Sequence, residues 1–158
     1  MATAIPQVIT SDRASGVKPI EGSLSFDSGR KPWLARTHNN QGTRIWTWSG
    51  WCKKSTNGAY HQLFTGFSSG TNQSGIIFMN DDSLRVYSQG SYAWELKTHA
   101  RYRDPNGWLH VCVAVDTDAS AASDRVKLWV NGVRQTYLVT ATYPDRAEKS
   151  YVIIDVQH

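Results

Sequence analysis

Short segments rich in β-branched and aromatic residues recur along the chain, and clusters of Gly, Asn, Asp and Ser separate them. This spacing is typical of an all-β sandwich or barrel. No convincing amphipathic helix competes with it, and residues 143–150 favour at most a single turn after Pro144. The predicted strands are residues 23–27, 32–36, 44–53, 61–67, 75–80, 83–89, 92–98, 107–117, 124–132, 133–141 and 150–156.

Two of the separating clusters predict β-hairpins. Asn131–Gly132 lies between two apolar runs, and Asn-Gly suits a two-residue turn because both turn positions need positive φ. Residues 80–82, Asn-Asp-Asp, predict a second hairpin, since these side chains bond their own backbone in turns. Both hairpins imply antiparallel pairing of the strands.

Alternation within the strands predicts which faces are buried. Val126, Leu128 and Val130 share one face of their strand, which we expect to meet the core. In residues 108–115, one face carries only Leu and Val side chains, and the other face is not strongly polar. That second face carries Trp108, His110, Cys112 and Ala114. We therefore expect this segment to be a central strand covered on both sides.

Three of the seven tryptophans stand close together in "RIWTWSGWCKK". Trp46 and Trp48 are two residues apart and lie on one face, which the alternation with small polar residues predicts to be buried. Gly50 indicates either a bulge or a close approach of backbone. Such a break would bring Trp51 to the same side as its predecessors.

Length and charge exclude several classes of protein. The 158 residues suit one domain, and no apolar run approaches the roughly 20 residues that cross a bilayer, so we expect no membrane insertion. The first residues do not form a secretion signal. The net charge of +4 is scattered, with its densest cluster at Lys97, Arg101 and Arg103, so we expect no nucleic-acid partner.

The two cysteines give little guidance about a metal or a disulfide. Cys52 and Cys112 match no paired-cysteine metal motif, and each falls in an apolar strand. A disulfide between them requires that the two strands face one another. The sequence leaves that pairing open.

The segments "SLSFD", "RIWTWSGWCK", "QLFTG", "SLRVYS", "RDPNGWLHVCVAVDT" and "DRVKLWVNGVR" have a familiar order and spacing. Together they resemble the laminin-G-like or concanavalin A-like jelly-roll domain, in the variant found in tail and fibre proteins of bacteriophages. The resemblance spans about residues 22–143. It implies two packed antiparallel sheets, and a role in assembly or host-surface recognition on a virion, outside any cell when mature.

The resemblance also implies a domain organisation and partners. Residues 1–21 resemble an extended arm, and residues 22–158 the jelly-roll domain. In this family further strands normally close a sheet after the region of residues 150–158. We therefore expect either a longer natural protein or completion of the sheet by another copy, with self-association and other virion proteins as partners.

Catalysis on glycans needs two carboxylates placed across one sugar. The three glutamates are far apart in the sequence, and Asp116 and Asp118 lie at a strand end where turn formation explains them. The glutamates are Glu21, Glu95 and Glu148. We predict no glycosidase site.

Nucleophilic catalysis has no better candidates. No serine lies in a G-x-S-x-G elbow, and His110 alternates with apolar neighbours, so we expect a core histidine. The remaining histidines considered, His38, His61 and His99, lie in or beside loops without an evident partner. We predict a protein that is not an enzyme and has no catalytic residues.

Oxygen-rich turns raise the question of calcium, which takes six to eight oxygen ligands. Residues 80–82 and 116–124 supply oxygens, but neither has the spacing of a helix-loop-helix calcium loop. Turn chemistry accounts for both. We predict no metal and no cofactor, with chelation as the test.

Carbohydrate binding without a metal stays open. Tyr60, Tyr92 and Tyr102 are loop aromatics that could stack on a sugar, and Asn72 or Asp104 could add hydrogen bonds. A host-surface glycan would then be the ligand. The alternatives to a tail or tail-fibre protein are a secreted carbohydrate-binding module, a capsid decoration protein of the same fold, and an enzyme of this architecture.

Overall fold

The computed structural model describes residues 26, 44–69 and 71–151 of the chain. The chain divides into two compact units, residues 1–36 and 37–158, and every helix and strand described lies in the second. The second unit therefore carries all of the structure below.

Several predictions about the ends of the chain fall mostly or wholly outside the described residues. They are the arm of residues 1–21, the strands of residues 23–27 and 32–36, and most of the strand of residues 150–156. The boundary at residue 22 and the closing of a sheet by another copy also stay predictions.

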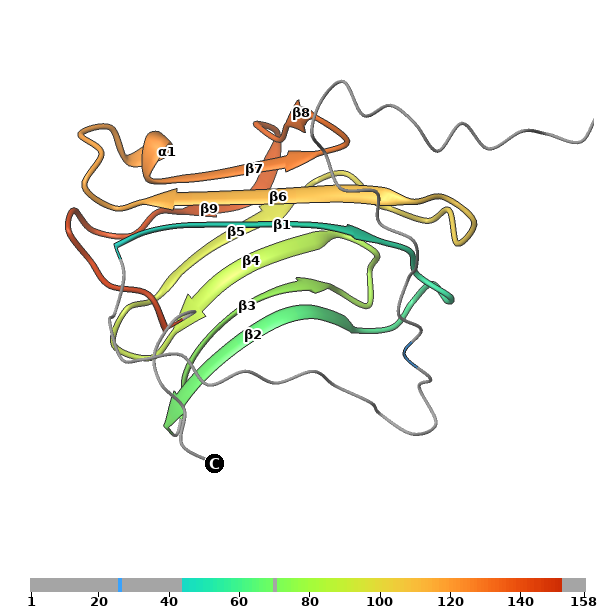
Figure 1. The fold of residues 1–158 in the computed structure, drawn as a ribbon, viewed down its shortest axis with the longest axis horizontal. Helices are drawn as coiled ribbons and strands as arrows, with labels where there is room; N and C mark the ends of the chain where they lie inside the picture. Colours follow the sequence, from blue (N-terminus) through green and yellow to red (C-terminus); the bar gives the residue numbers. More distant parts are fainter. Residues whose placement is uncertain (1–25, 27–43, 70, 152–158) are drawn as a thin grey trace, which may run out of the picture. The chain divides into compact units, whose positions relative to one another are not determined.

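The strands form two antiparallel sheets, which Figure 1 shows stacked as layers. One sheet has the order β1-β6-β7-β8, and the other has the order β2-β3-β4-β5-β9. The predicted all-β, two-sheet antiparallel sandwich is confirmed. The strands are β1 (Ile45–Cys52), β2 (His61–Ser69), β3 (Asn72–Phe78), β4 (Leu84–Gln89), β5 (Trp94–Thr98), β6 (Leu109–Asp116), β7 (Val126–Val130), β8 (Val133–Arg134) and β9 (Leu138–Thr142).

Both predicted hairpins are confirmed. Val130 pairs with Val133 across Asn131–Gly132, whose φ angles of 50° and 78° are both positive, as this turn requires. Phe78 pairs with Leu84 across the second turn. The local chemistry of the turn residues decided both connections.

The strand predicted over residues 133–141 is wrong as a single element. After β8 the chain leaves the first sheet, and Figure 1 shows it passing behind β7 and β6 to reach β9 in the second. The backbone amide of Gln135 still donates to Leu128 O, whereas Tyr137 O already accepts from the amide of His99. One apolar run therefore serves both sheets.

The short helix α1 (Ala122–Arg125) was not predicted, and it precedes β7 directly. Within the described ranges, no helix is long and apolar enough to cross a membrane. The turn expected after Pro144 is present, where the amide of Glu148 donates to Asp145 O at 3.2 Å. Ala147 in this turn has a φ of 63°, which ends any helical continuation.

The core lies between the two sheets and confirms the predicted apolar face. Val126 and Leu128 are each 1% exposed, and Val111 and Val113 on β6 are fully buried. Each such side chain contributes about 1.5–3 kcal/mol by leaving water. The second sheet faces them with Ile76, Phe78, Leu84, Val86, Trp94 and Leu96.

The tryptophans of β1 divide between the two faces of the sheet. Trp46 is 7% exposed and Trp48 packs against the core, as predicted. A Cβ added to Gly50 would lie 3.0 Å from the Trp48 ring, so this glycine permits a close approach. The pairing with β6 continues without a bulge through Trp51↔His110, and the prediction that Trp51 turns toward its predecessors is wrong.

The prediction that β6 is covered on both sides is also wrong. Its odd-numbered residues face the core, whereas Trp108 just before the strand is 50% exposed and His110 is only half-buried. His110 is therefore not a core histidine. Alternation places Cys52 on the inner face of β1 and Cys112 on the outer face of β6, so the two thiols are free and point to opposite sides.

Candidate functional site

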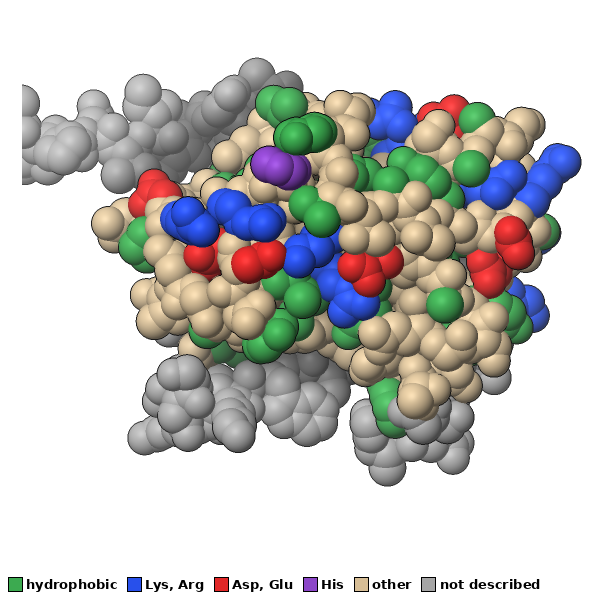
Figure 2. Space-filling view, turned by 180° about the vertical axis from the view of Figure 1, so that it is seen from behind, with side chains coloured by type: hydrophobic (Ala, Val, Ile, Leu, Met, Phe, Trp, Pro, Cys, Tyr) green, Lys and Arg blue, Asp and Glu red, His purple; other side chains and the backbone are tan. Residues whose placement is uncertain are grey.

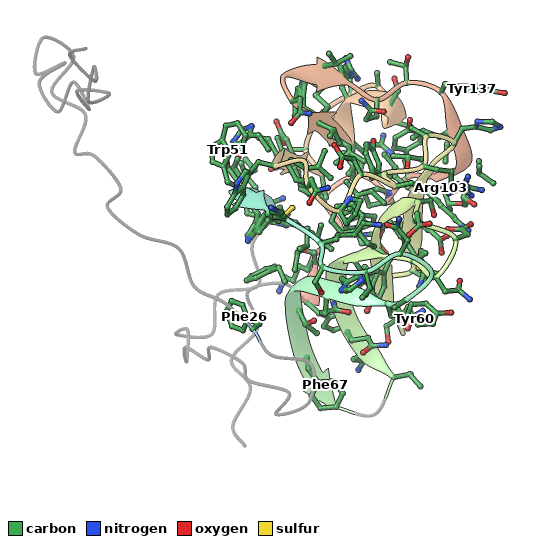
Figure 3. The ribbon with its side chains drawn as sticks, turned by 90° about the vertical axis from the view of Figure 1, so that its right-hand side faces the viewer. Phe26, Trp51, Tyr60, Phe67, Arg103 and Tyr137 are labelled. Carbon is green, nitrogen blue, oxygen red and sulfur yellow. The ribbon has the colours of Figure 1, made fainter. Side chains whose placement is uncertain are left out.

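Exposed aromatic rings gather on the outer face of the four-stranded sheet. Trp51, which pairs with His110, is 64% exposed, and Trp108, just before β6, is 50% exposed. The rings of Trp51 and His110 are 5.1 Å apart, tilted by 46°. In Figure 3, Trp51 points away from the sandwich, on the side opposite Tyr60, Arg103 and Tyr137.

Hydrogen bonds fix the position of the central imidazole. His110 Nε2 is 2.9 Å from Ser49 Oγ on the neighbouring strand. The His110 amide donates to Asn131 Oδ1 at 2.8 Å, and the Asn131 amide donates to His110 O at 2.8 Å. The β7–β8 hairpin thus holds the start of β6, and His110 is presented from a rigid strand.

Trp129 extends the aromatic surface across β7. It pairs with Cys112, in the row next to Trp51 and His110, and it is half-buried. We call the surface formed by five side chains the indole face: Ser49, Trp51, Trp108, His110 and Trp129.

The composition of the indole face suits a ligand with an apolar surface. Its five side chains combine ring faces with a hydroxyl and an imidazole, and Arg134, the cross-strand partner of Trp129, borders it on the same outer face. Exposed indoles bury much area against a partner, while their N–H groups still offer hydrogen bonds. Contiguous aromatic exposure of this kind marks binding surfaces on soluble proteins.

Three of the predicted ligand residues lie in the segments before β2 and after β5, at the same end of the second sheet. Figure 3 shows Tyr60 at this end. Tyr60 is 61% exposed in the segment before β2. Tyr102 is half-buried with its ring 5.8 Å from Phe78, and burial raises the pKa of its hydroxyl. The exposed carboxylate of Asp104 accepts the amide of Asn106 at 2.8 Å, which is turn chemistry.

The other two predicted ligand residues lie at the opposite end of the second sheet. Asn72 packs against Gly90, where an added Cβ would lie only 2.0 Å from its Oδ1, and the Tyr92 ring is 5.2 Å from that of Tyr151. Because the strands are antiparallel, successive turns lie at alternate ends of the sheet. The turns that lead into Asn72 of β3 and that carry Tyr92 before β5 therefore lie at the end away from Tyr60, Tyr102 and Asp104. The five residues do not form one site, and ligand contact by any of them stays a prediction.

The sequence reasoning missed the indole face. The sequence signal for this surface is the strict alternation of β1. Alternation places residue 51 on the other face of the strand from residues 46 and 48, unless Gly50 breaks the strand.

The carboxylate of Asp82, one of the suggested calcium ligands, is held by the chain itself. Its Oδ1 accepts from Lys54 Nζ at 2.8 Å and from the Gly58 amide at 3.0 Å, and Arg103 approaches its Oδ2 at 3.3 Å. The hydrogen bonds from Lys54 and Gly58 hold the pKa of Asp82 below its usual range. The ammonium group of Lys54 stands where a metal cation would be needed.

Asp81 is neutralised in the same way on the other side of the turn. Lys97 Nζ lies 2.8 Å and Arg101 Nη2 lies 3.3 Å from its Oδ2. Burial acts to raise the pKa of Asp81, but hydrogen bonds from Lys97 and Ser83 outweigh it and hold that pKa well below its usual range. Calcium at this turn would have to displace basic side chains.

The carboxylates of Asp116 and Asp118 are also engaged. Asp116 Oδ1 accepts the Asp118 amide at 3.1 Å, and Asp118 pairs with Arg44 at 3.0 Å. Among the described residues, no three His, Cys, Asp or Glu side chains group as metal ligands. Figure 2 shows basic and acidic side chains interleaved on the side opposite the view of Figure 1, without a patch of one sign.

Local partners hold the two described glutamates. Glu95 Oε2 accepts from Arg85 Nη2 at 2.6 Å on the outer face of the second sheet. Glu148 Oε2 accepts the Asp145 amide at 2.7 Å in the turn after β9, and burial raises the pKa of Glu148. Glu21 lies outside the described residues.

A family model described as the concanavalin A-like lectin/glucanases superfamily, Laminin_G_3, matches residues 28–155. The chain belongs to this family. The stated resemblance to a laminin-G-like, concanavalin A-like jelly roll is thereby confirmed. Comparison with curated proteins and with solved structures finds no significant match. A superfamily of lectins and glucanases contains both proteins that bind sugars and enzymes that cleave them.

Proposed function

We propose that this domain is a non-enzymatic recognition module that binds carbohydrate through the indole face. The observation that carries the proposal is the exposure of Trp51 on β1 and of Trp108 just before β6, with the His110 ring beside Trp51 and bonded to Ser49. Ring faces stack on the apolar faces of sugars, and the hydroxyl and imidazole suit sugar hydroxyls. Membership of a superfamily that includes lectins supports the same class of ligand.

Binding is favoured over turnover because the described carboxylates that were considered for glycan cleavage have other partners. Glu95 is bound by Arg85, and Asp116 and Asp118 serve a turn and an ion pair. A glycosidase needs one carboxylate free to attack or to activate water beside a second that donates a proton. A glucanase is the second candidate function, favoured only by the family.

We also propose a setting for this recognition. The domain would belong to a bacteriophage tail or tail-fibre protein, act in assembly or host-surface recognition, and contact other virion proteins and copies of itself. The order of sequence motifs supports this setting. A secreted carbohydrate-binding module and a capsid decoration protein are the alternatives.

A glycan array tests the ligand and the surface together. The wild-type protein should bind neutral glycans, and a Trp51→Ala, Trp108→Ala double variant should lose most of that signal. Tyr137→Ala is the matched control, because Tyr137 is 72% exposed on another side of the domain. Equal binding by the double variant and the control would refute the indole face as the site.

Two further measurements separate the alternatives. Release of reducing ends from a polysaccharide would identify a glucanase. A virion component should form a stable oligomer in light scattering or adhere to intact particles or host cells. A protein that stays monomeric and adheres to neither would contradict the tail setting while leaving glycan binding intact.

A further inference from the structure

A separate cleft opens at the edge of the sandwich, where the chain leaves β8 and crosses to β9. It has a volume of about 290 Å³ and is lined by residues of both sheets and of α1. Leu96 from β5 and Val126 from β7 form part of its wall and are 2% and 1% exposed. We call it the edge cleft.

The crossover itself creates the edge cleft. β8 contributes only two residues to the first sheet before residues 135–137 leave it, so no strand covers the gap between the sheets at this point. Gln135 stays beside the turn, with its Nε2 donating to Val133 O at 3.0 Å. The gap therefore has an apolar interior and a polar rim.

The rim carries an excess of positive charge. Lys127 Nζ and Arg134 Nη2 approach the same oxygen of Asp124, at 3.2 and 3.6 Å. Two cations thus share one carboxylate. Arg134 Nη2 also donates to Ser123 O at 3.1 Å. Both basic side chains are about one-third exposed or more, so these surface contacts are weak and their donors can turn to a ligand.

The other lining groups favour a hydroxylated ring over a purely apolar one. Tyr143 is half-buried and offers apolar ring surface, whereas Gln135 and Thr136 offer an amide and a hydroxyl. The volume is near the lower limit of small-molecule sites, which suits one ring and not an extended chain. A planar guanidinium such as that of Arg134 matches a carboxylate well.

We propose that the edge cleft binds a single sugar acid, a hexuronate, with its carboxylate at Lys127 and Arg134 and its ring against the half-buried side chain of Tyr143. This site shares no residue with the indole face, although Arg134 pairs with Trp129 between β7 and β8, and it does not rest on glycan binding at the indole face. It would let the domain distinguish acidic from neutral saccharides.

The test is an NMR titration of the isotopically labelled full chain at constant ionic strength. Sodium glucuronate should shift the amides of Lys127, Arg134 and Thr136, whereas glucose and sodium benzoate should shift them far less. Glucose tests the need for the carboxylate, and benzoate tests the need for the hydroxyls. Shifts absent with glucuronate, or equal with glucose or benzoate, would overturn the proposal.

Surface variants identify the contact. Arg134→Gln should weaken glucuronate binding by at least about tenfold, because it removes a charge-assisted hydrogen bond. Arg44→Gln is the control, since Arg44 also pairs with an exposed aspartate and its loss changes the net charge equally. Equal weakening by both variants would refute the site. The Trp51→Ala, Trp108→Ala variant should bind glucuronate normally, which keeps this test separate from that of the indole face.

Discussion

A hydrogen bond across the sandwich gives the sharpest prediction about stability. The indole Nε1 of Trp46 donates to Ser150 Oγ at 2.7 Å, between residues that are 7% and 0% exposed. Their separation of 104 positions means that the bond ties the segment after β9 to β1. Thr117 Oγ1 donates to Glu148 O at 2.7 Å in the same segment.

Ser150→Ala should leave the indole N–H buried without an acceptor. Such an orphaned donor costs about 1–3 kcal/mol of unfolding free energy. For a chain of this size that cost lowers Tm by about 2–12 °C. Trp46→Phe removes the donor instead. In that background, Ser150→Ala should lower the unfolding free energy by about 1–2 kcal/mol less than it does in the wild type.

Urea unfolding followed by circular dichroism measures all four proteins of this cycle. Ser55→Ala is the control, because Ser55 is exposed and its loss should change stability by less than about 0.5 kcal/mol. An unfolding midpoint for Ser150→Ala equal to that of the wild type, at the same slope, would refute the reasoning. Strict additivity in the cycle would do the same.

Three other predictions follow from single sites. The depressed pKa values of Asp81 and Asp82 stabilise the fold above the ordinary aspartate value of about 4. Urea midpoints should therefore fall as the pH drops from about 4 toward 2, and Asp82→Asn should reduce that fall; a flat profile would contradict the ion-pair cluster. Gly50→Val should destabilise the domain by about 1–3 kcal/mol, because its side chain meets the Trp48 ring, and an unchanged melting temperature would show that the ring moves freely. Burial raises the pKa of the Cys52 thiol to about 11, so its alkylation at pH 8.5, followed by peptide mass mapping, should be much slower in the folded than in the unfolded protein.

Part of this structure could be predicted from sequence because local chemistry decides it. Asn131 and Gly132 tolerate the positive φ that a two-residue turn requires, and this local preference favours the β7–β8 hairpin. Alternation with period two identified Val126, Leu128 and Val130 as core residues. These signals depend only on neighbouring residues, and they sufficed for the fold class and the strand pairing at the turns.

The candidate sites required the tertiary structure. The ring of Trp48 lies over Gly50, so a glycine is needed there although the strand has no bulge. The unbroken strand places Trp51 on the outer face. The sequence is compatible with either an inner or an outer position for Trp51. The predicted ligand residues share only a loop position and an aromatic or polar side chain. The strand order places them at two different ends of the sandwich.

The chain by itself determined an all-β sandwich with interior indoles at residues 46 and 48. Only the packing of the sheets decided that Lys54 neutralises Asp82, that one apolar run divides into β8 and β9, and that a cleft opens where it crosses. The reason is that turns and alternation are set by adjacent residues, whereas ion pairs and cavities depend on residues brought together from distant parts of the chain.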